Sequence, residues 1–484
     1  MDSLSPDQAQ ALWDAGGFLV LTDLPAGSEF GIDGTFHLTR RFSGIKFIPP
    51  GLHMITWSAS PSAGQGSQSS NTDDIVSGGP ASLTGAEPAA IPIRSALLRI
   101  WNPRERVVLP YNRQTESVPL PPSSTSNFSN EEEEPAQAIS EDHLRTLDPE
   151  MAAYPWDGFP RWNGLTNLIT REVLAGVLGN GRVDAMTPVE GEVDEPARKG
   201  ATRSAVLQVG TTEAGGTGGG GGGDGAAETA PALASTEERP MKFAQFELKR
   251  SWAEGAVGEE VTKWSRDKSW LLGHVVTEQL EGDATVLVAQ LQLAFVLLLY
   301  LSSWSALQAY KRVLTLLCQS PSFLTSPTDF LHPSSETSTK APKPPGTSNT
   351  STQVSGSGLR LARSSPSPTS SQQLVVKTYT SLLEVLSAQL GALPAGAFET
   401  ELPELDVFYL DQLESLRKGL VGGMESSIPP WSEEDKEGVR AAWGRLGAVA
   451  RKEWGWDLGE LQGGEDASDE EEEEGEYAPV VVEM

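Results

Sequence analysis

The residue types that most often carry catalysis or bind metals are few and scattered in this chain of 484 residues. Zinc sites need cysteine or histidine ligands at short, repeated spacings, and none of the histidines is paired in this way: His37, His53, His143, His274 and His332. The single cysteine, Cys318, lies among leucines, where a core residue is expected. No Gly-x-Ser-x-Gly nucleophile motif occurs. We therefore predict no metal site, no cofactor and no enzymatic activity.

Two further kinds of sequence run have non-catalytic interpretations. The glycine run 215–223 lacks the Lys-Ser/Thr pair of a phosphate-binding loop, and no strand pattern precedes it, so a flexible linker is favoured. The acidic runs 131–134 and 469–474 lie in loop-like sequence. Catalytic carboxylates need a buried site that tunes their pKa values, so we interpret these runs as solvated charge.

The composition narrows the classes of partner. The chain has 36 basic and 66 acidic residues, which gives a net charge of −30. Phosphate backbones repel such a chain and basic surfaces attract it, so we predict protein partners and no direct nucleic-acid binding. The alternative is that the acidity only keeps the chain soluble. A single cysteine permits no intramolecular disulfide, and the first ten residues show no secretory signal, so an intracellular protein is expected.

An uncharged stretch, 284–310, is long enough to cross a bilayer. Polar side chains interrupt it, among them Gln290, Gln292 and Ser302, and no basic cluster closely flanks either end. We therefore predict the buried central helix of a helical domain rather than a membrane span.

The elements that would position any site fall into two parts, and the first, 1–182, has a β-rich pattern. Short strand-like segments alternate with Gly/Pro turns: GFLVLTDL, TFHLTRRF, KFIPPGLHMITWSAS and SALLRIWNPRERVVLP. This spacing predicts a sandwich-like domain. Loops near 60–90 and 115–136 are predicted to be disordered. The apolar positions Leu165, Leu168 and Val173 predict one helix that ends at Gly179.

A Gly-rich flexible linker, 183–240, is predicted to lead to an all-α domain, 241–460. Apolar residues at a spacing of three to four, such as Val375, Tyr379 and Leu382, predict about six helices in it. A Ser/Thr/Pro-rich insert, 321–371, is predicted to be disordered, and an acidic tail, 461–484, ends in a β-prone peptide. The predicted fold class is α+β, with the β-rich domain first and the helical domain second.

Several blocks occur in a fixed order along nearly the whole chain: GSEFGID (27–33), RFSGIKFIPPGLH (41–53), YP…W…LTNLI (154–169), the helical block 288–320, W-x-W-D (454–457) and APVVVE (478–483). Together they resemble the Aar-two family, the mating-type cistron splicing factors that assemble the U5 snRNP. The insertions that depart from the family pattern fall between the blocks, so they leave the fold assignment intact. The matching residues are expected to be mainly structural: Gly27, Glu29, Phe30, Gly31, Asp33, Phe42, Gly44, Pro49, Pro50, Gly51, His53, Trp162, Leu165, Thr166, Leu291, Gln292, Phe295, Leu316, Leu317, Trp454 and Trp456.

The resemblance implies a VHS-like helical domain and a non-enzymatic assembly factor, present in cytoplasm and nucleus. Family members bind a large Prp-eight-type splicing scaffold through its RNase H-like and Jab/MPN-like domains, within an immature U5 particle. They prevent premature binding of the helicase and the RNA, which bind later. Release of the family member from the particle is linked to phosphorylation. A monomer is the default expectation. Without the resemblance, the alternative is a generic acidic adaptor that binds basic partners through the helical domain.

The peptide at the end of the acidic tail is rich in β-branched residues and is tethered by solvated charge. This combination predicts strand addition to the sheet edge of a partner, with these residues in contact: Ala478, Pro479, Val480, Val481, Val482 and Glu483. The alternative is that the peptide packs onto the chain's own β domain.

Three serines are candidate phosphorylation sites. Ser468 precedes a run of acids, and Ser365 and Ser367 each precede a proline. Added phosphate would increase repulsion or change a contact. The alternative is that these serines are inert.

Overall fold

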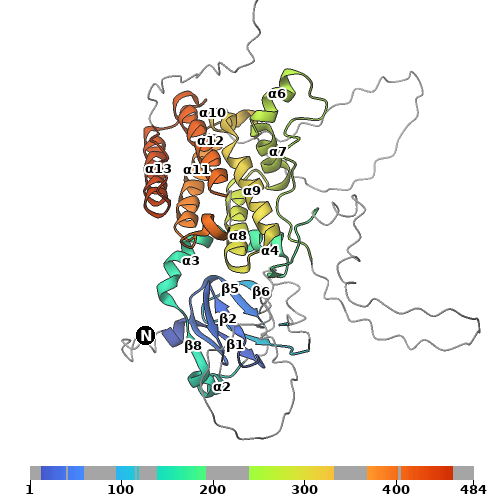
Figure 1. The fold of residues 1–484 in the computed structure, drawn as a ribbon, viewed down its shortest axis with the longest axis vertical. Helices are drawn as coiled ribbons and strands as arrows, with labels where there is room; N and C mark the ends of the chain where they lie inside the picture. Colours follow the sequence, from blue (N-terminus) through green and yellow to red (C-terminus); the bar gives the residue numbers. More distant parts are fainter. Residues whose placement is uncertain are drawn as a thin grey trace, which may run out of the picture. The chain divides into compact units, whose positions relative to one another are not determined.

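The structure is a computed structural model that describes residues 12–39, 42–58, 94–114, 117–118, 139–191, 239–331, 368–401 and 405–461. The chain divides into two compact units, Met1–Phe243 with Ala289–Tyr310, and Ala244–Val288 with Lys311–Met484. The first unit holds the strands and the second unit is helical (Figure 1), which confirms the predicted fold class. The acidic tail and most of each predicted insert lie outside the described residues.

The strands of the N-terminal unit form two sheets. The four-stranded sheet has the order β7 (Arg106–Pro110), β1 (Gly17–Thr22), β4 (Gly44–Ile48) and β8 (Met151–Ala153). The five-stranded sheet has the order β3 (Thr35–Leu38), β2 (Glu29–Ile32), β5 (Gly51–Ser58), β6 (Ser95–Trp101) and β9 (Arg182–Asp184). Strand β1 pairs antiparallel with β4 and parallel with β7. Every pair in the five-stranded sheet is antiparallel.

The main core of this unit contains side chains from both sheets, as a sandwich requires. Leu19 and Leu21 of β1 belong to it, whereas Phe18 and Val20, on the opposite face of the strand, pack with Leu144 of α2 (Glu141–Leu147). The five-stranded sheet contributes Phe30, Ile32, Ile55, Trp57, Leu97 and Trp101. Gly44 lets β4 approach β1, because a Cβ atom there would lie 1.9 Å from the carbonyl oxygen of Leu19.

The helix predicted from the pattern of Leu165, Leu168 and Val173 is two helices, α3 (Phe159–Thr166) and α4 (Arg171–Leu178). Thr170 takes an extended conformation, and its hydroxyl accepts a hydrogen bond from the Val173 N–H at 3.4 Å. It is therefore the N-cap of a new helix. The apolar spacing continues across the break, which is why the pattern predicted one helix.

The second half of the chain is built from helices. In chain order they are α6 (Glu259–Arg266), α7 (Ser269–Gln279), α8 (Thr285–Leu301), α9 (Trp304–Cys318), α10 (Pro321–Thr325), α11 (Pro368–Leu390), α12 (Leu405–Ser426) and α13 (Glu433–Trp454). Helix α11 packs against α13, and α10 packs against α12. Residues 287–297 of α8 are buried on every side, as predicted for a central helix. Among the described residues, no helix is long and apolar enough to cross a membrane.

The compact units do not follow the predicted domain boundary. The helical domain was predicted to span 241–460, whereas Ala289–Tyr310, from α8 and α9, groups with the β-rich unit. Gln292 of α8 shows why, because its side chain hydrogen-bonds to Asn167 and to the N–H of Leu168 between α3 and α4. Periodicity predicts a helix but not the partner that buries it.

The predicted disordered insert begins too early at 321. Pro321 opens the short helix α10, where its missing N–H is not needed. Phe323 and Leu324 in this helix are 0% and 1% exposed. The Phe323 N–H also donates to the Ser269 hydroxyl at 2.8 Å, which ties α10 to the start of α7. The described chain continues to Leu331 and resumes at Pro368 in α11.

Two other predicted boundaries also need correction. In the loop predicted as disordered at 115–136, Ser117 forms a β-bridge with Asn112, and Val118 belongs to the main core. In the linker predicted at 183–240, Val183 pairs within the five-stranded sheet as part of β9, and Val189 forms a bridge with Met241. These residues lie next to long stretches rich in Gly, Ser, Thr or Glu, so composition alone assigned them to loops.

Replacing Phe323 with alanine tests the corrected boundary. Phe323→Ala should lower the free energy of unfolding of the helical unit by about 3–5 kcal/mol, because it empties a buried aromatic site. Chemical denaturation followed by circular dichroism measures the change. Ser322→Ala, one residue earlier and only half-buried, is the matched control and should be nearly neutral. Equal denaturation midpoints for the two variants would contradict the corrected boundary and support a disordered insert that begins at 321.

Candidate functional site

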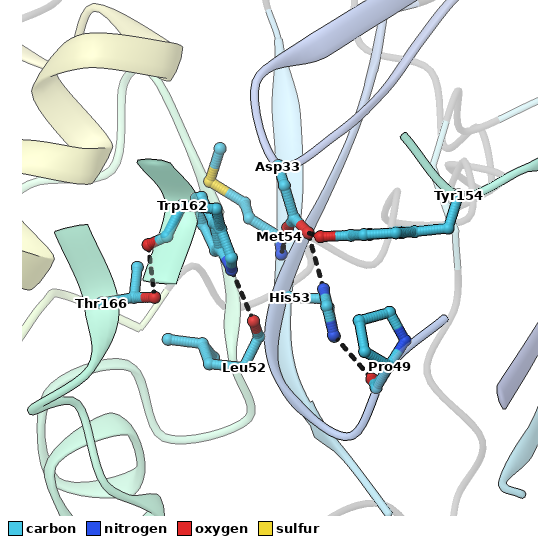
Figure 2. A network of polar contacts seen from close by, with 8 residues as sticks. All are labelled: Asp33, Pro49, Leu52, His53, Met54, Tyr154, Trp162 and Thr166. Atoms are coloured by element: carbon cyan, nitrogen blue, oxygen red, sulfur yellow. Dashed lines mark hydrogen bonds and ion pairs between the residues drawn. The ribbon is translucent and has the colours of Figure 1, made fainter. Parts of the chain in front are cut away.

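A buried carboxylate, that of Asp33, is the centre of a polar network in the N-terminal unit. Its Oδ2 atom lies 2.6 Å from Nδ1 of His53 and accepts a hydrogen bond from the Tyr154 hydroxyl at 2.6 Å. Its Oδ1 atom accepts from the backbone N–H of Met54 at 2.9 Å. Figure 2 shows these contacts converging on Asp33. One side chain thus joins the β2–β3 turn, strand β5 and the segment that follows β8.

Local sequence explains why Asp33 occupies this place. Asp33 and Gly34 form the two-residue loop between β2 and β3, since Ile32 pairs directly with Thr35. Both loop residues have positive φ, 50° and 79°, as in the type I′ turn that Asp-Gly favours. Gly34 is required for space as well, because a Cβ atom there would lie 2.2 Å from the ring of Tyr300.

His53 is fully buried and both of its ring nitrogens are engaged. Nε2 lies 2.8 Å from the carbonyl oxygen of Pro49, which can only accept, so Nε2 carries a proton. On the other side, one proton lies between Nδ1 and the Asp33 carboxylate. That shared proton satisfies the second contact of the ring. Neither nitrogen is left to act as a general base.

Tyr154 closes the network as a neutral donor. Burial, together with the adjacent Asp33 carboxylate and the hydrogen bond to it, raises the pKa of the Tyr154 phenol far above its usual range. Its ring packs edge-on against His53, with centroids 5.3 Å apart. His53 is 0% exposed and Tyr154 1%, so a substrate has no access to these groups. The network has the residue types of an acid–base site, but its closed geometry is structural.

A second set of hydrogen bonds connects strand β5 to the helices of the same unit. The indole N–H of Trp162 donates to the carbonyl oxygen of Leu52 at 2.6 Å, and the Thr166 hydroxyl donates to the carbonyl oxygen of Trp162 at 2.8 Å (Figure 2). The amide of Gln292, also fully buried, accepts from Leu168 at 3.0 Å and donates to Asn167 at 2.8 Å. The buried Trp162 indole and Gln292 amide both have hydrogen-bond partners. These bonds hold α3 against β5 and α8 against the segment that follows α3.

In the helical unit, the W-x-W-D residues form an aromatic cluster with a ring from another segment. Phe398, in a π-helix (Ala397–Glu401), lies 4.5 Å from Trp454 and 5.2 Å from Trp456 by ring centroids. The Trp454 indole N–H donates to the carbonyl oxygen of Leu390 at 3.1 Å. Arg451 hydrogen-bonds to Asp457 at 2.8 Å and lowers the pKa of that carboxyl group. The cluster ties the end of α13 to the end of α11.

The remaining signature residues have structural positions. Gly27, Gly44 and Gly51 have positive φ values, and Gly31 leaves room for Phe36 and Thr56. Glu29 forms an ion pair with Arg94, and Phe42 packs against Phe30. Pro49 supplies the carbonyl group described above, and Pro50 follows it before β5. The apolar members are almost fully buried: Phe30, Leu165, Leu291, Phe295, Leu316 and Leu317.

Sequence reasoning named Asp33 and His53 as signature residues but did not predict that they meet, and it gave Tyr154 no role. The three positions come together only because β5 pairs with β2 and the chain returns after β8. The Asp-Gly dipeptide was the available signal, since it marks a tight hairpin.

Some predicted sites lie outside the described residues. These are the tail strand at 478–483 and the three serines, Ser365, Ser367 and Ser468. Within the described ranges, no group of three or more His, Cys, Asp or Glu residues could hold a metal ion. Cys318 is buried, and its burial raises the pKa of the thiol.

Two models of one family match most of the chain. The AAR2 N-terminal domain matches residues 15–179, and the AAR2 C-terminal repeat region matches residues 243–459. The chain belongs to the AAR2 family. The AAR2 N-terminal match contains Asp33, His53 and Tyr154, and the C-terminal match contains Gln292 and the W-x-W-D cluster. The tail strand follows both matches.

Curated AAR2 relatives agree with this assignment. The chain is 26% identical over 319 residues to the protein AAR2 homolog of Pongo abelii. The aligned region covers 66% of this chain and 73% of that protein. It is 26% identical over 321 residues to the Mus musculus homolog, with the same coverage. A shorter match, 25% identical over 175 residues, joins it to the Caenorhabditis elegans homolog, with 36% and 38% of the two chains covered.

The Asp33 network makes a direct prediction about stability. Asp33→Asn keeps the side-chain volume but removes the charge that partners His53, so the free energy of unfolding should fall by about 3–5 kcal/mol. Combined with His53→Gln, the loss should be smaller than the sum of the two single losses by about 1 kcal/mol or more. Denaturant unfolding of the four proteins measures this coupling.

Asp23→Asn is the matched control, since Asp23 is exposed and also has a positive φ, 65°. Its effect should stay within about 0.5 kcal/mol. Additive losses for Asp33→Asn and His53→Gln would show that the two side chains do not depend on each other.

Proposed function

We propose that this chain is a non-enzymatic assembly factor for the splicing machinery. It binds a large Prp-eight-type scaffold protein together with other U5 snRNP proteins, and it holds back the helicase and the RNA that bind later. The observation that carries the proposal is the match of both AAR2 family models, in order, over residues 15–179 and 243–459. The expected compartments are the cytoplasm, where the particle is assembled, and the nucleus, where the chain is released.

The absence of catalysis in this proposal is supported by the closed geometry of the Asp33 network. An acid–base group must reach a proton on its substrate, and His53 uses both nitrogens for internal contacts. The side chains of the network are therefore assigned to holding the fold. Binding is assigned to the surface and to the tail.

Charge supports a protein partner with basic surfaces. The net charge of −30 disfavours direct contact with nucleic acid and accelerates encounter with a positively charged protein. A scaffold that binds RNA presents such surfaces. Occupying them with an acidic protein would also delay the RNA that competes for them.

The tail strand is the proposed docking element for a sheet edge of the scaffold. In an added strand, backbone hydrogen bonds supply affinity, and alternate side chains set the register. Val480 and Val482 would face one way and Val481 the other. The acidic run 469–474 provides the charged tether.

Affinity purification from cell extract with mass spectrometry tests both the partner and the tail. The full chain should recover the scaffold and U5 proteins, and a chain that ends at Gly475 should recover about tenfold less or none. Replacing Val480, Val481 and Val482 with glycine keeps the tail length and charge and should cause the same loss. Recovery of other basic proteins but no U5 protein would favour the generic adaptor. Undiminished recovery by the truncated chain would contradict the docking strand alone.

Phosphorylation is the proposed release signal, at Ser365, Ser367 and Ser468. Added phosphate next to an acidic run increases repulsion from neighbouring carboxylates and changes contacts with the partner. A chain with all three serines replaced by alanine should remain bound to the scaffold after incubation in extract with ATP, when the unchanged chain is released. Retention on beads over time measures this difference. Equal release of the two chains would show that these serines do not control release.

A further inference from the structure

Exposed basic side chains lie where the start of the helical unit meets the end of α6. We call them the basic cluster and define it as Lys249, Arg250, Lys263 and Arg266. The hydroxyl of Ser251, next to Arg250, donates to the carbonyl oxygen of Trp264 in the last turns of α6. Lys263 and Arg266 are three residues apart on this helix, so they lie on one side of it. In Figure 1, α6 lies at the same end of the helical unit as α10.

The basic cluster has no acidic partner among the described residues. None of its four side chains forms an ion pair with a residue that the structure describes. The acids of α6, Glu259 and Glu260, are in its first turn, at the opposite end from Lys263 and Arg266. The chain has 66 acidic residues, so four unpaired bases in one place are unusual here. They indicate an anionic ligand.

A buried ammonium group beside the cluster also lacks an anionic partner within the described ranges. Lys268 is 8% exposed, and its Nζ atom donates to the Ser251 hydroxyl at 3.1 Å and to the carbonyl oxygen of Ser265. Both of these partners are neutral. Asp267 is adjacent, but its Oδ1 atom accepts from the Ser269 N–H at 2.8 Å. Burial lowers the pKa of Lys268 despite the nearby Asp267 charge. Buried charges are normally paired, so an anion docked on the cluster would compensate this one.

The acidic run 469–474 can reach the basic cluster. The described chain ends at Leu461, in the same compact unit, and Asp469 is eight residues further on. Eight to thirteen extended residues span about 27–44 Å. Gly459 lies beside Arg417 of α12, α12 packs on α10, and α10 packs on α7, which begins three residues after the cluster. Neighbouring helix axes lie about 8–10 Å apart, so two such steps fall within the reach of the run.

We infer that, in the free chain, the acidic run 469–474 docks on the basic cluster of the same molecule and so keeps the tail strand, 478–483, close to its own helical unit. Each exposed ion pair is weak, but a tether of this length gives a roughly millimolar effective concentration. The other acidic run, 131–134, belongs to the other compact unit. A partner with basic surfaces would compete for the same acids and free the tail strand. Only this last consequence rests on the proposed function.

Carbodiimide crosslinking of the full chain, with mass spectrometry of the monomeric product, tests this docking. The reagent joins a lysine amine to a carboxylate only when the two are in direct contact. Lys249 or Lys263 should crosslink to 469–474, with a yield about fivefold lower at 0.5 M than at 0.05 M salt, because salt screens the attraction. Arg250→Gln with Arg266→Gln keeps both lysines but removes two positive charges, so the yield should fall about threefold. Circular dichroism confirms that each variant is folded.

Lys377→Gln with Arg440→Gln is the matched control, since it removes two exposed positive charges from α11 and α13 of the same unit. It should change the yield less than about 1.5-fold. A yield that responds neither to salt nor to the loss of Arg250 and Arg266 would contradict the inference. Crosslinks that join the two lysines to 131–134, or to a second molecule, would overturn it as well. The experiment contains no scaffold protein, so its failure would leave the proposed function standing, and the affinity purification tests that function separately.

Discussion

The buried Asp33 carboxylate is the interaction on which the N-terminal unit depends. A charged group in a dry interior is tolerated only when it is paired and hydrogen-bonded, and Asp33 obtains this from His53, Tyr154 and the Met54 N–H. These partners come from segments far apart in sequence. Separation of any one segment would leave a buried charge without its compensation, so the segments are held together as a set.

This dependence extends from the sandwich to helices. Strand β5, which carries His53 and Met54, also offers the Leu52 carbonyl to Trp162 of α3. The end of α3 is fixed in turn by Gln292 of α8. Gly34, next to Asp33, allows Tyr300 of α8 to approach the hairpin. Asp33, His53, Trp162 and Gln292, all residues of the family signature, therefore belong to this framework.

Much of the architecture could be predicted from the sequence, because it follows from period and turn chemistry. Strand-like segments between Gly/Pro turns predicted β1 and β5, an uncharged apolar stretch predicted α8, and apolar residues at helical spacing predicted α11 and α13. Other features depend on contacts that no local pattern encodes. Thr170 splits a continuous apolar pattern, Phe323 is buried shortly after a proline, and the 289–310 segment contacts the first unit through Gln292 and Tyr300. The Asp33–His53–Tyr154 contact arises only once the strands have paired.

Hydrogen–deuterium exchange of the full chain, with and without the purified scaffold domains, tests the central claim that framework and binding surfaces are separate. The account predicts new protection at 478–483. It also predicts no change around Asp33, His53 and Tyr154, which are already slow to exchange because they are buried and hydrogen-bonded. Protection that appears in β2 and β5 while 478–483 stays unchanged would contradict it.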